Sequence, residues 1–159
     1  MGGKAIGFAA RGGWWVVAQV PVLLGALVVP LVWGAASFDS LNPIQLAGAA
    51  LAASGILLAI AGVARLGRSL TPFPQPLAKA RLRQSGVYRF VRHPIYAGLI
   101  AASLGWSLSW LSLPGAAFCA VVMLFFDRKS AFEEQFLRAR YPEYHGYMRR
   151  VRKLIPWVY

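Results

Sequence analysis

The sequence predicts an all-α integral membrane protein with about four transmembrane helices. Of its 159 residues, 58% are hydrophobic and only 14% are charged, whereas soluble domains carry about 25% charged residues. The charges lie in separate blocks and leave three stretches without Asp, Glu, Lys, Arg or His: residues 14–34, 44–64 and 94–126. Because a spanning helix needs about 20 apolar residues, the first two stretches predict one span each, over residues 14–34 and 44–65.

The third stretch is too long for one span, because a helix over residues 94–126 would extend for roughly 50 Å across a hydrocarbon core of ~30 Å. The segment Ser112-Leu113-Pro114-Gly115 combines proline and glycine, which interrupt helices. We therefore expect a hairpin of two spans, over residues 94–112 and 115–130. The last span continues beyond the membrane into a C-terminal amphipathic helical region in the cytoplasm.

Other protein classes fit this composition poorly. The only cysteine, Cys119, has no partner in the chain, which argues against a disulfide-stapled secreted domain. The first apolar stretch is longer than the roughly 7–15 residues of a signal peptide, so we expect it to be a retained span. Two histidines, His93 and His145, have no third ligand at zinc spacing, and no metal site is predicted.

The basic residues predict the orientation of the chain. The net charge is +12, and the bases lie before the first span, at 65–92, and at 128–153. The connection over residues 35–43 holds Asp39 and no base. By the positive-inside rule both termini and the 65–93 loop are cytoplasmic. This rule already explains the basic clusters, so no nucleic-acid partner is expected; the prediction is a multi-pass membrane protein.

The polar residues fall into two clusters, residues 86–96 before the hairpin and residues 133–159 after it. A hairpin returns to the membrane face that it left, so the clusters should meet. Four spans without an intramembrane charge fit an ion pathway poorly. The clusters are therefore where we expect chemistry.

Two interpretations of the first cluster are open. Pro94 suits the first turn of a helix, which places His93 at a helix start that favours an anion, with Arg89 and Arg92 nearby. The alternative makes the arginines snorkelling anchors and the tyrosines, including Tyr96, part of an aromatic belt.

The second cluster has the same ambiguity. Lys129 and Glu133 are spaced i, i+4 on a helix, and Glu134 is adjacent. These carboxylates suit a cationic ligand, or they form a solvated face with weak ion pairs. The basic run at residues 149–153 suits anionic lipid headgroups.

Residues from both clusters form one ordered pattern. It runs Tyr88-x3-Arg92-His93-Pro94-x-Tyr96-x-Gly98-x6-Gly105, then Glu133-x3-Leu137, then Tyr144-x2-Tyr147-x2-Arg150 and Pro156. With the membrane hairpin, this pattern over residues 66–157 resembles the isoprenylcysteine carboxyl methyltransferase family, which is similar to the phospholipid N-methyltransferases. The resemblance implies one membrane methyltransferase domain over residues 1–159, with two N-terminal spans in 1–65 and a catalytic core in 66–159.

The resemblance also implies S-adenosylmethionine as cofactor, S-adenosylhomocysteine as product, and a cytoplasmic active site. Glu133 matches the family's cofactor-binding acid and Glu134 is its neighbour; which one functions is open. Arg92, Glu133 and Arg150 are the candidate catalytic residues. The candidate cofactor-binding residues are Tyr88, His93, Pro94, Tyr96, Glu133, Glu134, Tyr144, Tyr147 and Pro156.

The acceptor implied is a lipophilic small molecule or prenylated substrate reached from the lipid bilayer. A carboxylate acceptor needs no general base, whereas an amine or thiol must first lose a proton. Methylation of oxygen, nitrogen or sulfur and the oligomeric state stay open. A non-catalytic membrane scaffold or transporter subunit that retains the pattern is the alternative function.

Overall fold

The computed structural model describes residues 7–37 and 42–159, and all the regular secondary structure in these ranges is helical, as predicted. Lys4 and Asp39, which entered the topology prediction, lie outside the described residues. The elements are α1 (Gly13–Trp33), α2 (Pro43–Leu66), η1 (Gly67–Ser69), η2 (Gly86–Arg89), α3 (Pro94–Ser109), α4 (Leu113–Arg140) and α5 (Tyr144–Arg150).

The helix starts follow local capping signals. Asn42 and Gln45 form a capping box at the start of α2. At the start of α4 the Ser112 side chain accepts a hydrogen bond from the Gly115 amide, 3.1 Å away. The hairpin turn is therefore at the predicted position.

Two predicted boundaries differ from the structure. α3 ends at Ser109 rather than at residue 112, because Leu111 takes a left-handed φ of 48° in the turn. α4 begins at Leu113 rather than at residue 115 and runs to Arg140, beyond the predicted span end at 130. The same helix thus carries both the apolar segment predicted as the fourth span and the charged residues that follow it.

Within residues 7–37 and 42–159, two helices have the length and composition to cross a membrane: α1, and the segment Pro43–Ser69 that contains α2. In the most apolar 18-residue stretch of each segment, only 11% and 17% of the residues are buried. These helices therefore expose apolar side chains such as Leu24 and Leu57. Such exposure fits a lipid environment and not the core of a soluble domain. The count of four spans stays a prediction.

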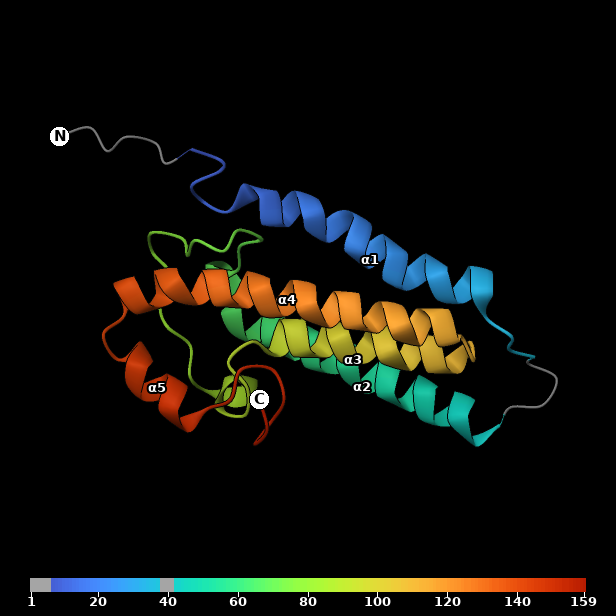
Figure 1. Ribbon diagram of the computed structural model, residues 1–159. Helices are drawn as coiled ribbons and strands as arrows, with labels where there is room; N and C mark the ends of the chain where they lie inside the picture. Colours follow the sequence, from blue (N-terminus) through green and yellow to red (C-terminus); the bar gives the residue numbers. More distant parts are fainter. Residues whose placement is uncertain (1–6, 38–41) are drawn as a thin grey trace.

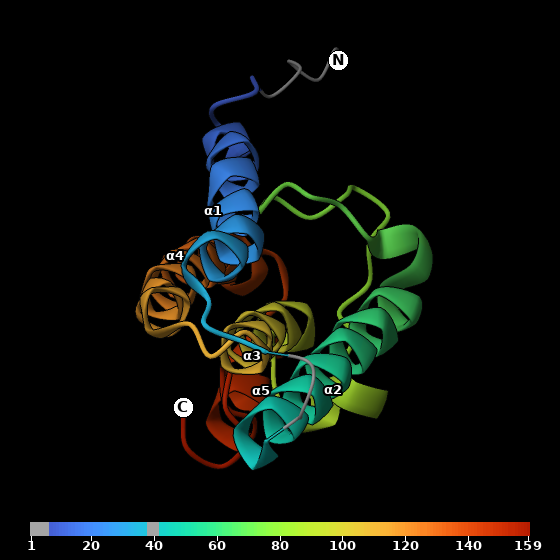
Figure 2. The ribbon, with the colours of Figure 1, turned by 90° about the vertical axis from the view of Figure 1, so that its right-hand side faces the viewer.

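The central helix of the bundle is α3. It packs against α2 on one side and α4 on the other, and α1 packs mainly against α4. Figure 1 shows these helices running side by side, and Figure 2, which looks along the bundle, shows α3 between α2 and α4. A buried cluster of Ala26, Val122 and Phe126 joins α1 to α4, with Leu99 of α3 packed against it.

Glycines allow α2 and α3 to approach closely. Gly48, Gly55 and Gly62 recur every seven residues along α2, opposite Gly98 and Gly105 of α3. Seven residues are about two helical turns, so each set lies on one face. A methyl group added to Gly55 would lie 2.5 Å from the Gly98 carbonyl oxygen. The backbones are therefore in direct contact.

We expect Gly55→Ala to lower the free energy of unfolding. Alanine normally stabilises a helix by roughly 1 kcal/mol over glycine, but here its methyl group meets backbone atoms, and such overpacking costs about 1–3 kcal/mol. Gly146→Ala is the control, because the nearest atom to its added methyl group is 4.0 Å away. Thermal unfolding in detergent checks both; equal stabilisation by both variants would contradict the close contact.

Candidate active site

The two polar clusters meet at one end of the bundle. The Arg92 amide donates to the Arg152 carbonyl at 2.8 Å, and the His93 amide donates to the Lys153 carbonyl at 3.1 Å. The C-terminal tail therefore lies beside the segment that leads into α3. Figure 1 shows α5 and the C-terminus gathered at this end. The meeting predicted from the hairpin is confirmed.

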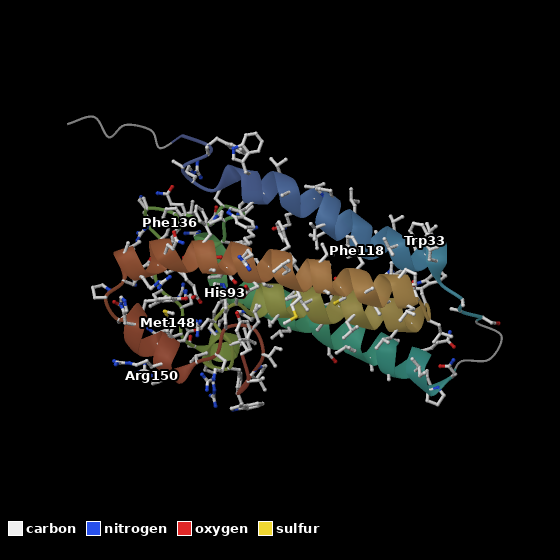
Figure 3. All side chains as sticks on the ribbon, in the orientation of Figure 1. Trp33, His93, Phe118, Phe136, Met148 and Arg150 are labelled. Atoms are coloured by element: carbon white, nitrogen blue, oxygen red, sulfur yellow. The ribbon has the colours of Figure 1, made fainter. Side chains whose placement is uncertain are left out.

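His93 is the residue that precedes the first turn of α3, and Pro94 begins the helix. The His93 ring caps no backbone group there; it stacks on the Tyr96 ring with centroids 5.6 Å apart and an interplanar angle of 7°. Figure 3 shows His93 between the start of α3 and α4. The ring nitrogens are thus directed at side chains of α4.

Glu134 of α4 is the acceptor in a buried ion cluster. Its Oε1 accepts from Arg92 Nε at 2.9 Å and lies 3.0 Å from His93 Nε2. All three side chains are less than a tenth exposed. Burial alone raises the pKa of the Glu134 carboxyl, but the hydrogen bonds and charges of His93 and Arg92 outweigh it and lower the pKa to about 2.

Arg92 also joins α5 to this cluster. Its guanidinium donates to the carbonyl of Val151 at 2.5 Å and to that of Met148 at 3.4 Å. Both carbonyls belong to the C-terminal end of α5, where a cation is favourable. One arginine therefore ties the start of α3, α4 and α5 together.

Glu133 has a different environment from its neighbour. Tyr96 donates its hydroxyl hydrogen to Glu133 Oε2 at 2.9 Å, and His93 Nδ1 lies 3.9 Å from the same oxygen. The other oxygen, Oε1, has no hydrogen-bond partner among the described residues. The Glu133 side chain is 26% exposed, against 6% for Glu134.

Three tyrosines line the same region. The Tyr147 hydroxyl donates to the Tyr88 carbonyl, and the Tyr88 hydroxyl donates to the Gly62 carbonyl at 3.4 Å. Tyr144 is 1% exposed, and its hydroxyl interacts with the Glu134 carboxylate without a well-formed hydrogen bond among the described residues. Burial raises the pKa of Tyr144 and of Tyr147, so both phenols keep their protons at neutral pH.

These groups face a pocket of about 310 Å³, within the size range of small-molecule sites. Residues of α1, α2, α3, α4, α5 and the connecting loop 69–83 all contribute to its wall. The candidate residues that line it are Tyr88, Arg92, His93, Tyr96, Glu133, Tyr144 and Tyr147.

Four other candidates do not line the pocket. Glu134 lies behind Arg92 and His93, and Pro94 is buried at the start of α3. Arg150 is exposed on the outer side of α5 (Figure 3), and Pro156 is half-buried in the tail. These four residues support or surround the pocket and do not form its wall.

Sequence reasoning missed Lys129 and Gln19 as members of the pocket wall. Lys129 is 1% exposed, donates to the Gln19 amide oxygen and lies 5.5 Å from the centroid of the Tyr96 ring. No described atom pair forms the ion pair expected between Lys129 and Glu133. A signal was present in the sequence, because Gln19 is the one amide side chain in residues 14–34.

Sequence reasoning also missed the connecting loop 69–83, which contributes Pro72, Pro74 and Pro76 to the pocket wall. Tyr141 donates to the Ala80 carbonyl at 2.7 Å, and Arg140 donates to the Leu77 carbonyl at 2.8 Å. Two residues before Leu77, the Gln75 amide donates to the Arg11 carbonyl at 3.4 Å. The middle of the loop is therefore attached to the end of α4 and to the segment before α1.

The sequence of this chain also matches a known protein family. Residues 44–144 match the sequence model of the family described as phospholipid methyltransferase. This match covers more than half of the chain, including α2, α3, α4 and the first residue of α5.

Curated relatives match shorter segments. Methanethiol S-methyltransferase 1 of Bradyrhizobium diazoefficiens is 36% identical over 95 residues, which cover 58% of this chain and 30% of the relative. Protein-S-isoprenylcysteine O-methyltransferase B of Arabidopsis thaliana is 32% identical over 80 residues, covering 49% and 41%. A protein named probable protein-S-isoprenylcysteine O-methyltransferase, from Oryza sativa subsp. indica, is 34% identical over 80 residues, covering 49% and 42%. The match thus spans less than half the length of each relative.

We expect Glu134→Gln to destabilise the fold by about 3–5 kcal/mol, because it leaves the buried Arg92 guanidinium without an anion. Glu143→Gln is the matched control, since Glu143 is exposed and its neutralisation should change stability by less than about 0.5 kcal/mol. Unfolding in detergent measures both. Equal effects of the two substitutions would show that the buried carboxylate is not what holds this end together.

The lowered pKa of Glu134 predicts how the free energy of unfolding changes with pH in the acid range. Its pKa of about 2 lies below the ordinary value of 4.5, so its contribution to stability is complete above pH 4.5 and is lost as the pH falls toward 2. The difference in free energy of unfolding between the wild type and Glu134→Gln should therefore shrink over this range. A difference that stays constant from pH 5 to pH 2 would contradict the lowered pKa.

Proposed function

Because this chain belongs to the phospholipid methyltransferase family, we propose that it is a membrane-embedded methyltransferase that uses S-adenosylmethionine. Its acceptor is lipophilic: a prenylcysteine-like carboxylate, a lipid amine or a small thiol. The relative named for isoprenylcysteine supports a carboxylate acceptor, and the relative named for methanethiol supports a small thiol.

The observation that carries the proposal is the different environment of two neighbouring glutamates. Glu134 pairs with Arg92 and lies 3.0 Å from His93 Nε2, and Glu133 faces the pocket with one oxygen that lacks a partner among the described residues. A carboxylate in this position suits the ammonium group of the cofactor's methionyl part.

Other features of the pocket fit the rest of the cofactor. The first turn of α3 supplies backbone N–H groups at a helix start, which favour a carboxylate. The aromatic rings of Tyr88 and Tyr141 in the wall suit a planar purine.

The chemistry supplied by S-adenosylmethionine is an electrophilic methyl group on a sulfonium. The chain itself has to orient the acceptor and exclude water, and such positioning can supply ~7–11 kcal/mol. A carboxylate acceptor needs no base. For an amine or thiol, His93 and Glu133 are the groups of the wall that can accept a proton.

We also propose four spans, formed by α1, α2, α3 and α4, with the pocket and both termini on the cytoplasmic face of a prokaryotic inner membrane. In support, α3 and α4 run beside the two long apolar helices (Figure 1). The loop 67–93 and the segment 141–159, which surround the pocket, hold most of the bases, as cytoplasmic segments do.

Calorimetry with S-adenosylmethionine and S-adenosylhomocysteine on the detergent-purified protein tests the proposal. We expect micromolar binding that Glu133→Ala weakens at least roughly tenfold, the size of one lost charge-assisted hydrogen bond. His93→Ala should weaken binding as well, and Glu143→Ala, on the exposed surface, is the control. Absence of binding to folded wild-type protein would overturn the enzyme and favour a non-catalytic scaffold.

A further inference from the structure

A second charged group faces the pocket in addition to the cofactor-side carboxylate. Lys129 lies on α4 one helical turn before Glu133, on the side toward the middle of the helix. Its side chain contributes to the pocket wall although the residue is only 1% exposed. The ammonium is therefore enclosed by the protein and directed at the space that a ligand would fill.

The protein compensates this ammonium only in part, through the Gln19 amide and the electrostatic attraction of Glu133. Among the described residues, the Gln19 amide oxygen is its one hydrogen-bond partner, and no carboxylate lies within 4.0 Å of it. The acids nearby have other partners: Glu133 pairs with Tyr96 and Glu134 with Arg92 and His93. A buried cation is costly unless an anion accompanies it.

The surroundings of Lys129 suit an anion on a lipophilic molecule. Tyr96 contacts both charged groups, since its ring lies 5.5 Å from the Lys129 ammonium and its hydroxyl donates to the Glu133 carboxylate. The wall also contains the apolar side chains of Val63, Ile95 and Leu99. A ligand there would have a charged end at Lys129 and an apolar remainder against these side chains.

We propose that the Lys129 ammonium, held by Gln19, binds the anionic group of the methyl acceptor and so restricts acceptors to carboxylates or thiolates. The inference rests on the proposed methyltransferase function and narrows its substrate class. An anionic oxygen or sulfur gives its electron pair to the methyl carbon, and the sulfonium sulfur keeps the pair of the bond that breaks. A carboxylate has no proton to lose at neutral pH. A thiol first gives its proton to His93 or Glu133 of the pocket wall and then reacts as the thiolate.

The same charge disfavours an amine acceptor. A lipid amine arrives protonated at neutral pH and would have to bind beside a fixed cation of the same sign. It would then have to lose its proton before reacting. Lys129 therefore acts as a specificity-determining residue for the charge of the acceptor.

Calorimetry with two probes tests the inference: N-acetyl-S-farnesylcysteine, which carries the carboxylate, and its neutral amide. The variants are Lys129→Met and Lys129→Gln, which both remove the charge but replace it with an apolar and a polar side chain. If only one of them folds, that variant still gives the result. Lys79→Met is the matched control, because Lys79 is exposed and outside the pocket wall. S-adenosylmethionine binding is measured in parallel for each protein.

We expect both Lys129 variants to bind the carboxylate roughly 10- to 100-fold more weakly, as the loss of a charge-assisted hydrogen bond implies. Binding of the amide and of S-adenosylmethionine should change by less than about threefold. In a methyl-transfer assay, we expect the protein to methylate N-acetyl-S-farnesylcysteine or methanethiol. The compound that reacts shows whether the acceptor is a carboxylate or a thiolate. Phosphatidylethanolamine should be a poor acceptor.

Three outcomes would overturn the inference: unchanged carboxylate binding in the Lys129 variants, an equal loss of S-adenosylmethionine affinity, or efficient methylation of phosphatidylethanolamine. Failure of the proposed function looks different. In that case wild-type protein would bind no S-adenosylmethionine, and the carboxylate probe would still bind in a Lys129-dependent way.

Discussion

The structure of the polar end depends on one buried carboxylate. Glu134 accepts from Arg92 and approaches His93 to 3.0 Å, with all three side chains almost inaccessible to water. In such surroundings each charge requires its partner, because an unpaired ion would cost several kcal/mol. Arg92 then extends the constraint to the carbonyls at the end of α5. The segment before α3, the charged half of α4 and the C-terminal tail therefore form one unit.

A second ion pair fixes the tail from the other side. Lys153 binds Asp127 of α4 at 2.5 Å, and the Tyr159 hydroxyl donates to the same carboxylate at 2.8 Å. Lys153 also offers its backbone carbonyl to the His93 amide. Because α4 is continuous from Leu113 to Arg140, it carries Asp127, Glu133 and Glu134 on a single rigid element. The positions of the pocket side chains on α4 are thus set by the apolar part of the same helix, which packs in the bundle.

Much of this arrangement could be predicted from the sequence, because the signals are local. The uncharged stretches indicated the helices, Pro114 and Gly115 indicated the turn, and the hairpin indicated that residues 86–96 and 133–159 meet. The Arg-His-Pro-x-Tyr pattern indicated a family relationship that the phospholipid methyltransferase match confirms. These inferences need only spacing, charge and helix-breaking residues, which act over a few positions.

The remainder depends on contacts between distant segments. The sequence did not decide between Glu133 and Glu134, because a single residue's difference in helix rotation places one toward the pocket and the other toward Arg92. It also paired Lys129 with Glu133 by i, i+4 spacing. In the structure Lys129 turns to Gln19, which is far away in sequence and reaches it only because α1 packs on α4.

The charge of the pocket follows from these same contacts. Since Glu134 already offsets Arg92, the wall retains one carboxylate, Glu133, and one buried ammonium, Lys129. Arg81 and Arg83 of the loop add positive charge at the exposed side. If the proposed cofactor binds, its ammonium and carboxylate would occupy Glu133 and the start of α3. We therefore expect the acceptor to be the ligand that places an anion beside Lys129.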